Sequence, residues 1–115
     1  MPNIKGNEGI LLQPGTKTTR IIEVPVKTNI NEKKGFLAPG TTISNINLIA
    51  TKNETGINVT TDLIQTYSFD DDSITITFKY PNINGDGRYK LKITLAISSG
   101  DVEIITMDRI VAVTL

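Results

Sequence analysis

Apolar and polar residues alternate along two stretches of the chain, Ser73 to Tyr80 and Tyr89 to Ile97. Side chains of a β-strand point to opposite faces of a sheet in turn, so each stretch predicts a strand with one buried face. Between them, Asn84-Gly85-Asp86-Gly87 is rich in residues that tolerate tight reversals. The pattern predicts one antiparallel β-hairpin packed on one side, and its expected inward residues are Ile74, Ile76, Phe78, Tyr80, Tyr89, Leu91, Ile93, Leu95 and Ile97.

Three earlier segments also predict strands. The β-branched run Thr19 to Lys27 contains Pro25, which cannot donate to a sheet ladder and predicts an edge strand, a bulge or a strand end there. Between Thr42 and Thr51 the apolar positions change parity near Ser44-Asn45, which predicts a β-bulge. In the mixed segment that follows the Thr55-Gly56 turn, the expected inward residues are Ile57, Val59 and Leu63.

The C-terminal run begins after the turn Ser98-Ser99-Gly100-Asp101. Val102 and Ile104 share one parity and the later apolar residues the other, so we expect one register slip near Ile104-Ile105. No segment of useful length shows the periodicity of an amphipathic helix. About seven short strands with turn signals at intervals of roughly ten residues predict an all-β fold, an immunoglobulin-like antiparallel β-sandwich.

The first residues of the chain differ from the rest. Met1 to Gly9 is polar, Ile10-Leu11-Leu12 is a short apolar patch, and Gln13-Pro14-Gly15 signals a turn. Two interpretations follow, an ordered first strand or an extended arm that docks on a neighbouring subunit. We therefore divide the chain into residues 1–18, an N-terminal arm or extra strand, and residues 19–115, the sandwich; the predicted partner-binding residues are Ile10, Leu11 and Leu12.

The composition removes most catalytic chemistry. The chain of 115 residues has no Cys, His or Trp, so it lacks disulfides, thiolate ligands and the usual general base near neutral pH. Twelve basic and twelve acidic residues give a net charge of zero, which provides no long-range field for nucleic acid or an anionic membrane. Met1 to Gly9 does not resemble a signal peptide. We predict a soluble, non-enzymatic protein without cofactor, nucleic-acid or membrane partner.

Two segments carry oxygen-rich side chains. Asn82 to Gly87 imitates the first half of a calcium loop, but the position of the bidentate Glu falls on Ile93 inside a strand. Asp70-Asp71-Asp72 lies between predicted strands and is expected to be a solvated turn, as is the basic cluster Lys33-Lys34 with Lys27 nearby. We therefore predict no metal site.

The order of several short motifs carries a resemblance to a known family. These are the apolar strand Ile21 to Val26, the strand entry Pro39-Gly40-Thr41-Thr42-Ile43-Ser44, the alternating strand Ser73 to Lys79, the turn Gly85-Asp86-Gly87-Arg88-Tyr89, and the closing pair of strands Ile93 to Val113. The stretch from Gly35 to Val113 thus resembles small immunoglobulin-like virion proteins of tailed bacteriophages, of the fibre or tail adaptor type.

This resemblance implies a non-enzymatic building block of the phage tail, neck, fibre or capsid surface. Its expected partners are other virion structural proteins and further copies of itself, and its expected location is the virion, after synthesis in the host bacterial cytoplasm. The alternative is a carbohydrate- or receptor-binding sandwich module. Such modules stack sugars on exposed aromatic side chains, and this chain has only three Tyr and three Phe.

Overall fold

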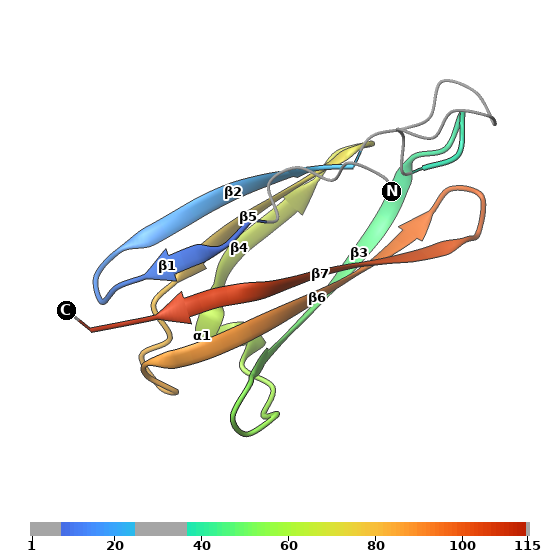
Figure 1. Ribbon diagram of the computed structural model, residues 1–115. Coiled ribbons are helices and arrows are strands. Elements are labelled where there is room, and N and C mark those ends of the chain that lie inside the picture. The colour runs from blue at the N-terminus through green and yellow to red at the C-terminus, as the bar shows by residue number, and fades with distance from the viewer. Residues whose placement is uncertain (1–7, 25–36, 115) are drawn as a thin grey trace.

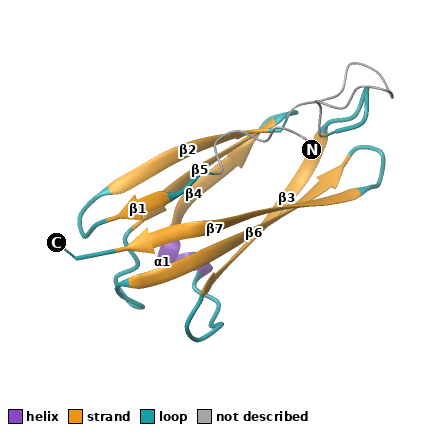
Figure 2. Cartoon of the chain, viewed as in Figure 1, coloured by secondary structure: helices purple, strands orange, loops and turns teal. Residues whose placement is uncertain are grey.

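Seven strands and one short helix make up the part of the chain that the structure, a computed structural model, describes: residues 8–24 and 37–114 (Figure 1). In chain order they are β1 (Ile10–Leu12), β2 (Lys17–Glu23), β3 (Ile43–Lys52), α1 (Thr60–Leu63), β4 (Ile64–Phe69), β5 (Ser73–Lys79), β6 (Gly87–Ile97) and β7 (Val102–Ala112). The strands form two facing sheets, ordered β1-β7-β6-β3 and β2-β5-β4 (Figure 2).

The strand order is that of an immunoglobulin-like sandwich. The sheet β2-β5-β4 matches the B, E and D strands of a constant-type domain, and β3-β6-β7 matches the C, F and G strands. All pairs are antiparallel except β1 with β7, which is parallel. The predicted all-β, immunoglobulin-like sandwich is therefore confirmed.

One hydrophobic core fills the space between the sheets. The predicted alternation is observed on β5 and β6, where every second residue is buried. Five residues expected in the core are fully buried, with 0% of their surface exposed: Ile76, Phe78, Leu91, Ile93 and Leu95. Burying a side chain of this size contributes about 1.5 to 3 kcal/mol, so this shared core holds the two sheets together.

The predicted hairpin between β5 and β6 is wrong. β5 pairs with β2 and β4, whereas β6 pairs with β3 and β7, so the two strands lie in opposite sheets. Residues 80–86 cross from one sheet to the other. Alternation specifies which face of a strand is buried, but two strands that face the same core can lie side by side or across it.

Two register irregularities explain the parity changes along the sequence. The pairing of β3 with β6 shifts between Ile43 and Asn45, as predicted. In β7, by contrast, the slip expected near Ile104-Ile105 occurs further along, where Leu91 pairs with Met107 and Tyr89 with Ile110. The extra residue lies at positions 108–109, so Val102 and Ile104 keep their outward parity.

The segment between β3 and β4 is partly as expected. Val59 and Leu63 are buried, but Ile57 is 55% exposed, contrary to the prediction. Val59 directly precedes the single turn of α1, and Leu63, the last residue of α1, is fully buried in the core just before β4 begins. The predictions for Pro25, for the Lys27, Lys33 and Lys34 cluster, and for Leu115 lie outside the described residues.

The described residues near the N-terminus are part of the sandwich. Ile10, Leu11 and Leu12 form β1 and pair with Ile110 to Ala112 of β7. Lys17 and Thr18 already belong to β2, so the boundary that we placed after residue 18 falls inside a strand. For the described residues of this segment, the correct alternative is the ordered first strand.

Candidate functional site

The predicted partner-binding residues are divided between core and surface. Ile10 is 4% exposed and Leu12 is fully buried, because their side chains face the core of their own chain. The docking role predicted for these two residues is therefore wrong. Leu11 points the other way and is 55% exposed, so it is the one member of the set that a partner can reach.

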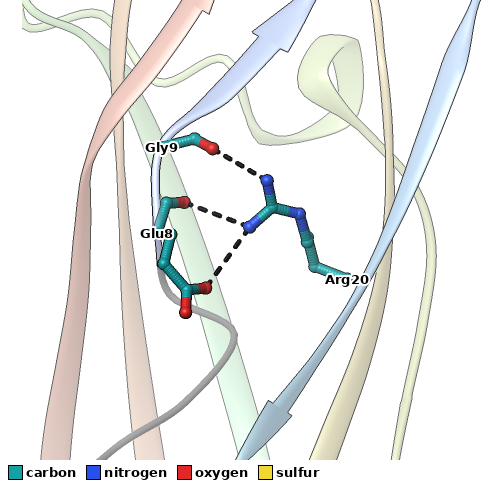
Figure 3. Close-up of polar contacts among 3 residues, drawn as sticks. All are labelled: Glu8, Gly9 and Arg20. Carbon is teal, nitrogen blue, oxygen red and sulfur yellow. Dashed lines mark hydrogen bonds and ion pairs between the residues drawn. The ribbon is translucent and has the colours of Figure 1, made fainter.

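Arg20 fixes the entry to β1 (Figure 3). Its Nη2 donates to the backbone carbonyl of Gly9 at 2.8 Å, and its Nη1 lies 3.4 Å from both the carbonyl and the carboxylate of Glu8. Arg20 belongs to β2, in the sheet opposite to β1. This contact therefore ties the start of β1 across the sandwich to the other sheet.

The outer side of the sheet β1-β7-β6-β3, which we call the open face, is covered by no described segment of the chain. Its part nearest the β6–β7 turn carries two exposed aliphatic side chains, Val102, which is 62% exposed, and Ile104, which is 52% exposed. A third, Ile49, is 37% exposed and lies opposite Lys92 in the middle of the sheet. Val102 lies opposite Ala96, and Ile104 lies opposite Thr94. Large aliphatic side chains thus share a flat surface with small neighbours that do not cover them.

The other part of the open face is basic. Arg88, Lys90 and Lys92 occupy three successive outward positions on β6, and all three are exposed. We call them the basic stripe. Beside it lies a hollow of about 550 Å³, lined among others by Lys90, Thr106 and Asp108. Within the described residues, no carboxylate lies within 4.0 Å of a stripe nitrogen, so these cations are available to a partner.

Six of the eleven described acidic residues lie toward one end of the sandwich. The β4–β5 and β6–β7 turns meet there through the entry to β3, since Ile43 N donates to Asp71 O at 2.8 Å and Ser98 N donates to Thr42 O at 2.8 Å. The carboxylates of this acidic end are Glu23, Asp70, Asp71, Asp72, Asp101 and Glu103. These two bonds use backbone atoms; Asp70, Asp71 and Asp72 are exposed, and the Asp101 carboxylate accepts a hydrogen bond from the Ser99 hydroxyl at 2.9 Å.

The loop between β5 and β6 is held by an internal network. Asp62 of α1, which is 7% exposed, accepts hydrogen bonds from the backbone N–H groups of Ile83 and Asn84, at 3.2 and 2.9 Å, and from Asn84 Nδ2 at 2.9 Å. Lys52 Nζ donates to the Asn84 carbonyl at 2.7 Å. The oxygens and N–H groups of this loop thus serve to fix it to α1 and β3.

Asp86, the carboxylate of the calcium-like motif, is also engaged. It accepts hydrogen bonds from the hydroxyls of Tyr80, at 2.5 Å, and Thr114, at 2.8 Å. The bond from Tyr80 lowers the pKa of Asp86, and the same bond raises the pKa of Tyr80. Among the described residues, no group of three or more acidic side chains is placed to hold a metal ion. The described part likewise has no helix long and apolar enough to cross a membrane.

Tyr89 forms the tyrosine corner of immunoglobulin-like domains, which we did not predict. Its ring is fully buried at the start of β6, and its hydroxyl donates to the carbonyl of Gly85 at 2.6 Å. Gly85 has a φ of 75°, a conformation that glycine adopts without strain. Leu91 follows two residues later, where antibody domains place a cysteine. The corner could have been predicted from the sequence, because a Tyr at an inward position of a strand follows closely after a glycine-rich loop.

Only part of the open face has a signal in the sequence. Lys90 and Lys92 alternate with the expected inward residues of the predicted strand Tyr89 to Ile97, and the structure places both on the exposed face, with Arg88 beside them. What the sequence did not reveal is that Ile49, Val102 and Ile104 from two other strands lie on the same surface. That juxtaposition depends on the strand order.

Comparison with known proteins supports the fold alone. No protein-family model matches the chain, and no curated protein matches it. Among solved structures, murine CRIg matches with a TM-score of 0.55 and 8% identity, covering 100% of this chain and 98% of that one. A chimeric titin Z1Z2 carrying a decorin peptide matches with a TM-score of 0.48 and 15% identity, covering 99% of this chain and 95% of that one. Titin Z1Z2 in complex with telethonin gives a TM-score of 0.46 and 17% identity, covering 99% of this chain and 47% of that one.

Proposed function

We propose that this chain is a non-enzymatic structural module of a tailed-phage virion, which assembles with other proteins through its open face. The observation that carries the proposal is the exposure of Ile49, Val102 and Ile104 on one sheet face beside a basic stripe. Scattered single apolar residues are normal on a protein surface, whereas a patch rimmed by polar groups is typical of an interaction site.

The size of the open face suits this role. The strands are spaced about 4.8 Å apart; three of them have ten or eleven residues and β1 has three, so at ~3.3 Å per residue the face covers about 550 Å². One partner in a standard protein interface contributes about 800 Å². The face, which includes the exposed Leu11 of β1, therefore supplies roughly two-thirds of that area.

The phage assignment comes from the sequence motifs named above, and the surface chemistry agrees with it. The chain has neither His nor Cys, and the open face presents exposed side chains along neighbouring strands of a sheet. Flat faces suit protein contacts better than small substrates, which are bound in concave pockets.

A carbohydrate- or receptor-binding module is the second candidate. Tyr67 of the edge strand β4 is 54% exposed and borders a hollow of about 350 Å³ lined by Thr60, Thr61 and Gln65. An exposed ring beside hydroxyl and amide groups is an arrangement on which a sugar can stack. If this candidate is correct, Tyr67→Ala abolishes binding to an array of bacterial surface glycans, while Ile104→Lys leaves that binding unchanged.

The deciding experiment measures the mass of the full chain by sedimentation velocity, alone and with purified candidate virion proteins. Ile104→Lys places a charge in the open face, and Ile83→Lys is the control because Ile83 is 87% exposed in the β5–β6 loop. We expect Ile104→Lys to weaken association at least tenfold and Ile83→Lys to leave it unchanged. Equal behaviour of the two variants, or a wild-type chain that stays monomeric with every virion protein, would refute the proposal.

A further inference from the structure

The charges of this neutral chain are unevenly distributed over its surface. The acidic end carries six carboxylates, Glu23, Asp70, Asp71, Asp72, Asp101 and Glu103. No described Lys or Arg lies among them; the described cations occupy other parts of the sandwich, namely Lys17, Arg20, Lys52, Lys79, Arg88, Lys90, Lys92 and Arg109. Among the described residues, one end of the sandwich is therefore acidic and one strand of the open face is basic.

The two charged surfaces cannot neutralise each other within one copy. Lys92, the stripe residue nearest the acidic end, and Ile97 are five residues apart on β6, which corresponds to about 17 Å at ~3.3 Å per residue. Ile97 N–H donates to Asp101 O at 2.9 Å, so Asp101 lies beyond Ile97, whereas Glu103 lies opposite Leu95. At physiological ionic strength the Debye length is about 8 Å, so the stripe and the acidic end are screened from each other. A second copy can bring them into contact.

Apolar side chains accompany both charged surfaces. On the open face, Ile104 and Val102 are exposed on β7, nearer to the β6–β7 turn than the basic stripe is. At the acidic end, Ile21 is 58% exposed and Phe69 is 36% exposed, beside Glu23 and Asp70 respectively. A contact between the two surfaces would bury apolar area and pair opposite charges, which is the usual composition of a specific interface.

We propose that the partner of the basic stripe is the acidic end of a second copy of this chain, so that copies associate head to tail. This inference rests on the proposed function and names the partner of the same face. The two contacting patches are different, so the contact is heterologous, and a pair of copies keeps one free stripe on one copy and one free acidic end on the other. Repetition of such a contact gives a ring if the rotation closes and a filament if it does not.

Paired charge reversals test this arrangement on the full-length chain. The stripe variant is Lys90→Glu with Lys92→Glu, and the end variant is Asp71→Lys with Asp72→Lys. The carbonyls of Asp71 and Asp72 accept hydrogen bonds from Ile43 and Val24 through the backbone, so the side-chain changes preserve those bonds. The matched control is Lys17→Glu with Lys79→Glu, which changes the net charge as the stripe variant does but lies on the opposite sheet. Thermal unfolding verifies that each variant is folded. A variant that does not fold is replaced by one in which the same lysines are changed to Gln, or the same aspartates to Asn.

We expect the wild-type chain and the control variant to self-associate in sedimentation velocity, more than tenfold more weakly in 500 mM than in 50 mM NaCl. Each reversed variant alone is expected to be monomeric. An equimolar mixture of the two should restore association, because the intact acidic end of one meets the intact stripe of the other.

Three outcomes would overturn the inference. Self-association that is insensitive to salt and to both reversals would show an apolar contact between copies, and the proposed function would stand. A wild-type chain that is monomeric alone but binds another virion protein would also leave the proposed function intact while removing the second copy as partner. Failure of the mixture to restore association would show that the two patches do not contact each other.

Discussion

Replacing Tyr89 by Phe tests the corner on which the β5–β6 crossing depends. The substitution removes the hydroxyl that donates to Gly85 O at 2.6 Å and leaves the buried ring in place. No cavity is created, so the cost is that of a carbonyl oxygen left without its partner, about 1 to 3 kcal/mol. We expect the free energy of unfolding at pH 8, measured by urea denaturation, to fall by this amount.

The same variant carries a pH signature. Burial, with a smaller contribution from the Asp62 charge, raises the pKa of Tyr89 to about 12, against 10.0 for an exposed tyrosine. Below pH 10 the hydroxyl is protonated in both states, and its contribution to stability is fully present. Between pH 10 and 12 the unfolded chain releases this proton and the folded chain keeps it, so stability is lost as the pH rises. With about 1.4 kcal/mol per pKa unit, the loss is on the order of 2 to 3 kcal/mol.

Urea titrations at a series of pH values from 8 to 12 measure this loss. Other groups also titrate in that range, so the informative quantity is the difference between wild type and Tyr89→Phe, with Tyr67→Phe as the control at an exposed hydroxyl. We expect the difference in unfolding free energy to shrink toward pH 12 for Tyr89→Phe and to stay constant for Tyr67→Phe. A difference for Tyr89→Phe that is the same at pH 8 and pH 12 would refute the reasoning.

Further outcomes follow from the core and the loops. Ile93→Ala should lower the unfolding free energy by about 2 to 5 kcal/mol through lost burial and a cavity, and a loss under about 0.5 kcal/mol would contradict the assigned face. Leu12→Ala should cost a similar 2 to 5 kcal/mol, against less than about 0.5 kcal/mol for the exposed Leu11→Ala, and a chain that begins at Thr19 should fail to fold as a monomer. Asp62→Ala should cost about 1.5 to 3 kcal/mol by freeing the N–H groups of the β5–β6 loop, as urea denaturation would report. Calcium at low millimolar concentration should leave the melting temperature unchanged, since a ligand stabilises only by binding the folded state; a rise of several degrees would reveal a site at residues 82–87.

The sequence by itself determined the fold class and most of the buried positions. Alternation along β5 and β6 predicted the inward side chains correctly, because one face of each strand must be removed from water whatever its neighbours are. The parity change at Ser44-Asn45 likewise predicted the shift in β3. These features depend on a residue and its close neighbours in the chain, and a local pattern therefore records them.

Only the tertiary structure decided which strands lie side by side. Backbone hydrogen bonds between strands are the same for every sequence, so alternation could not tell a hairpin of β5 with β6 from a crossing between sheets. For the same reason, alternation could not tell whether the strand with Ile10 and Leu12 pairs with β7 of its own chain or with a neighbouring subunit.

The candidate surface belongs to the same category. Ile49 is far in sequence from Val102 and Ile104, and the three share a face only because β6 separates β3 from β7 in one sheet. The stripe is visible in the sequence as three alternating cations, and half of the acidic end as the run Asp70-Asp71-Asp72, but their positions at separate parts of the sandwich follow from strand direction and length. A surface assembled from distant segments has no local pattern, so its composition became apparent only once the strand order was known.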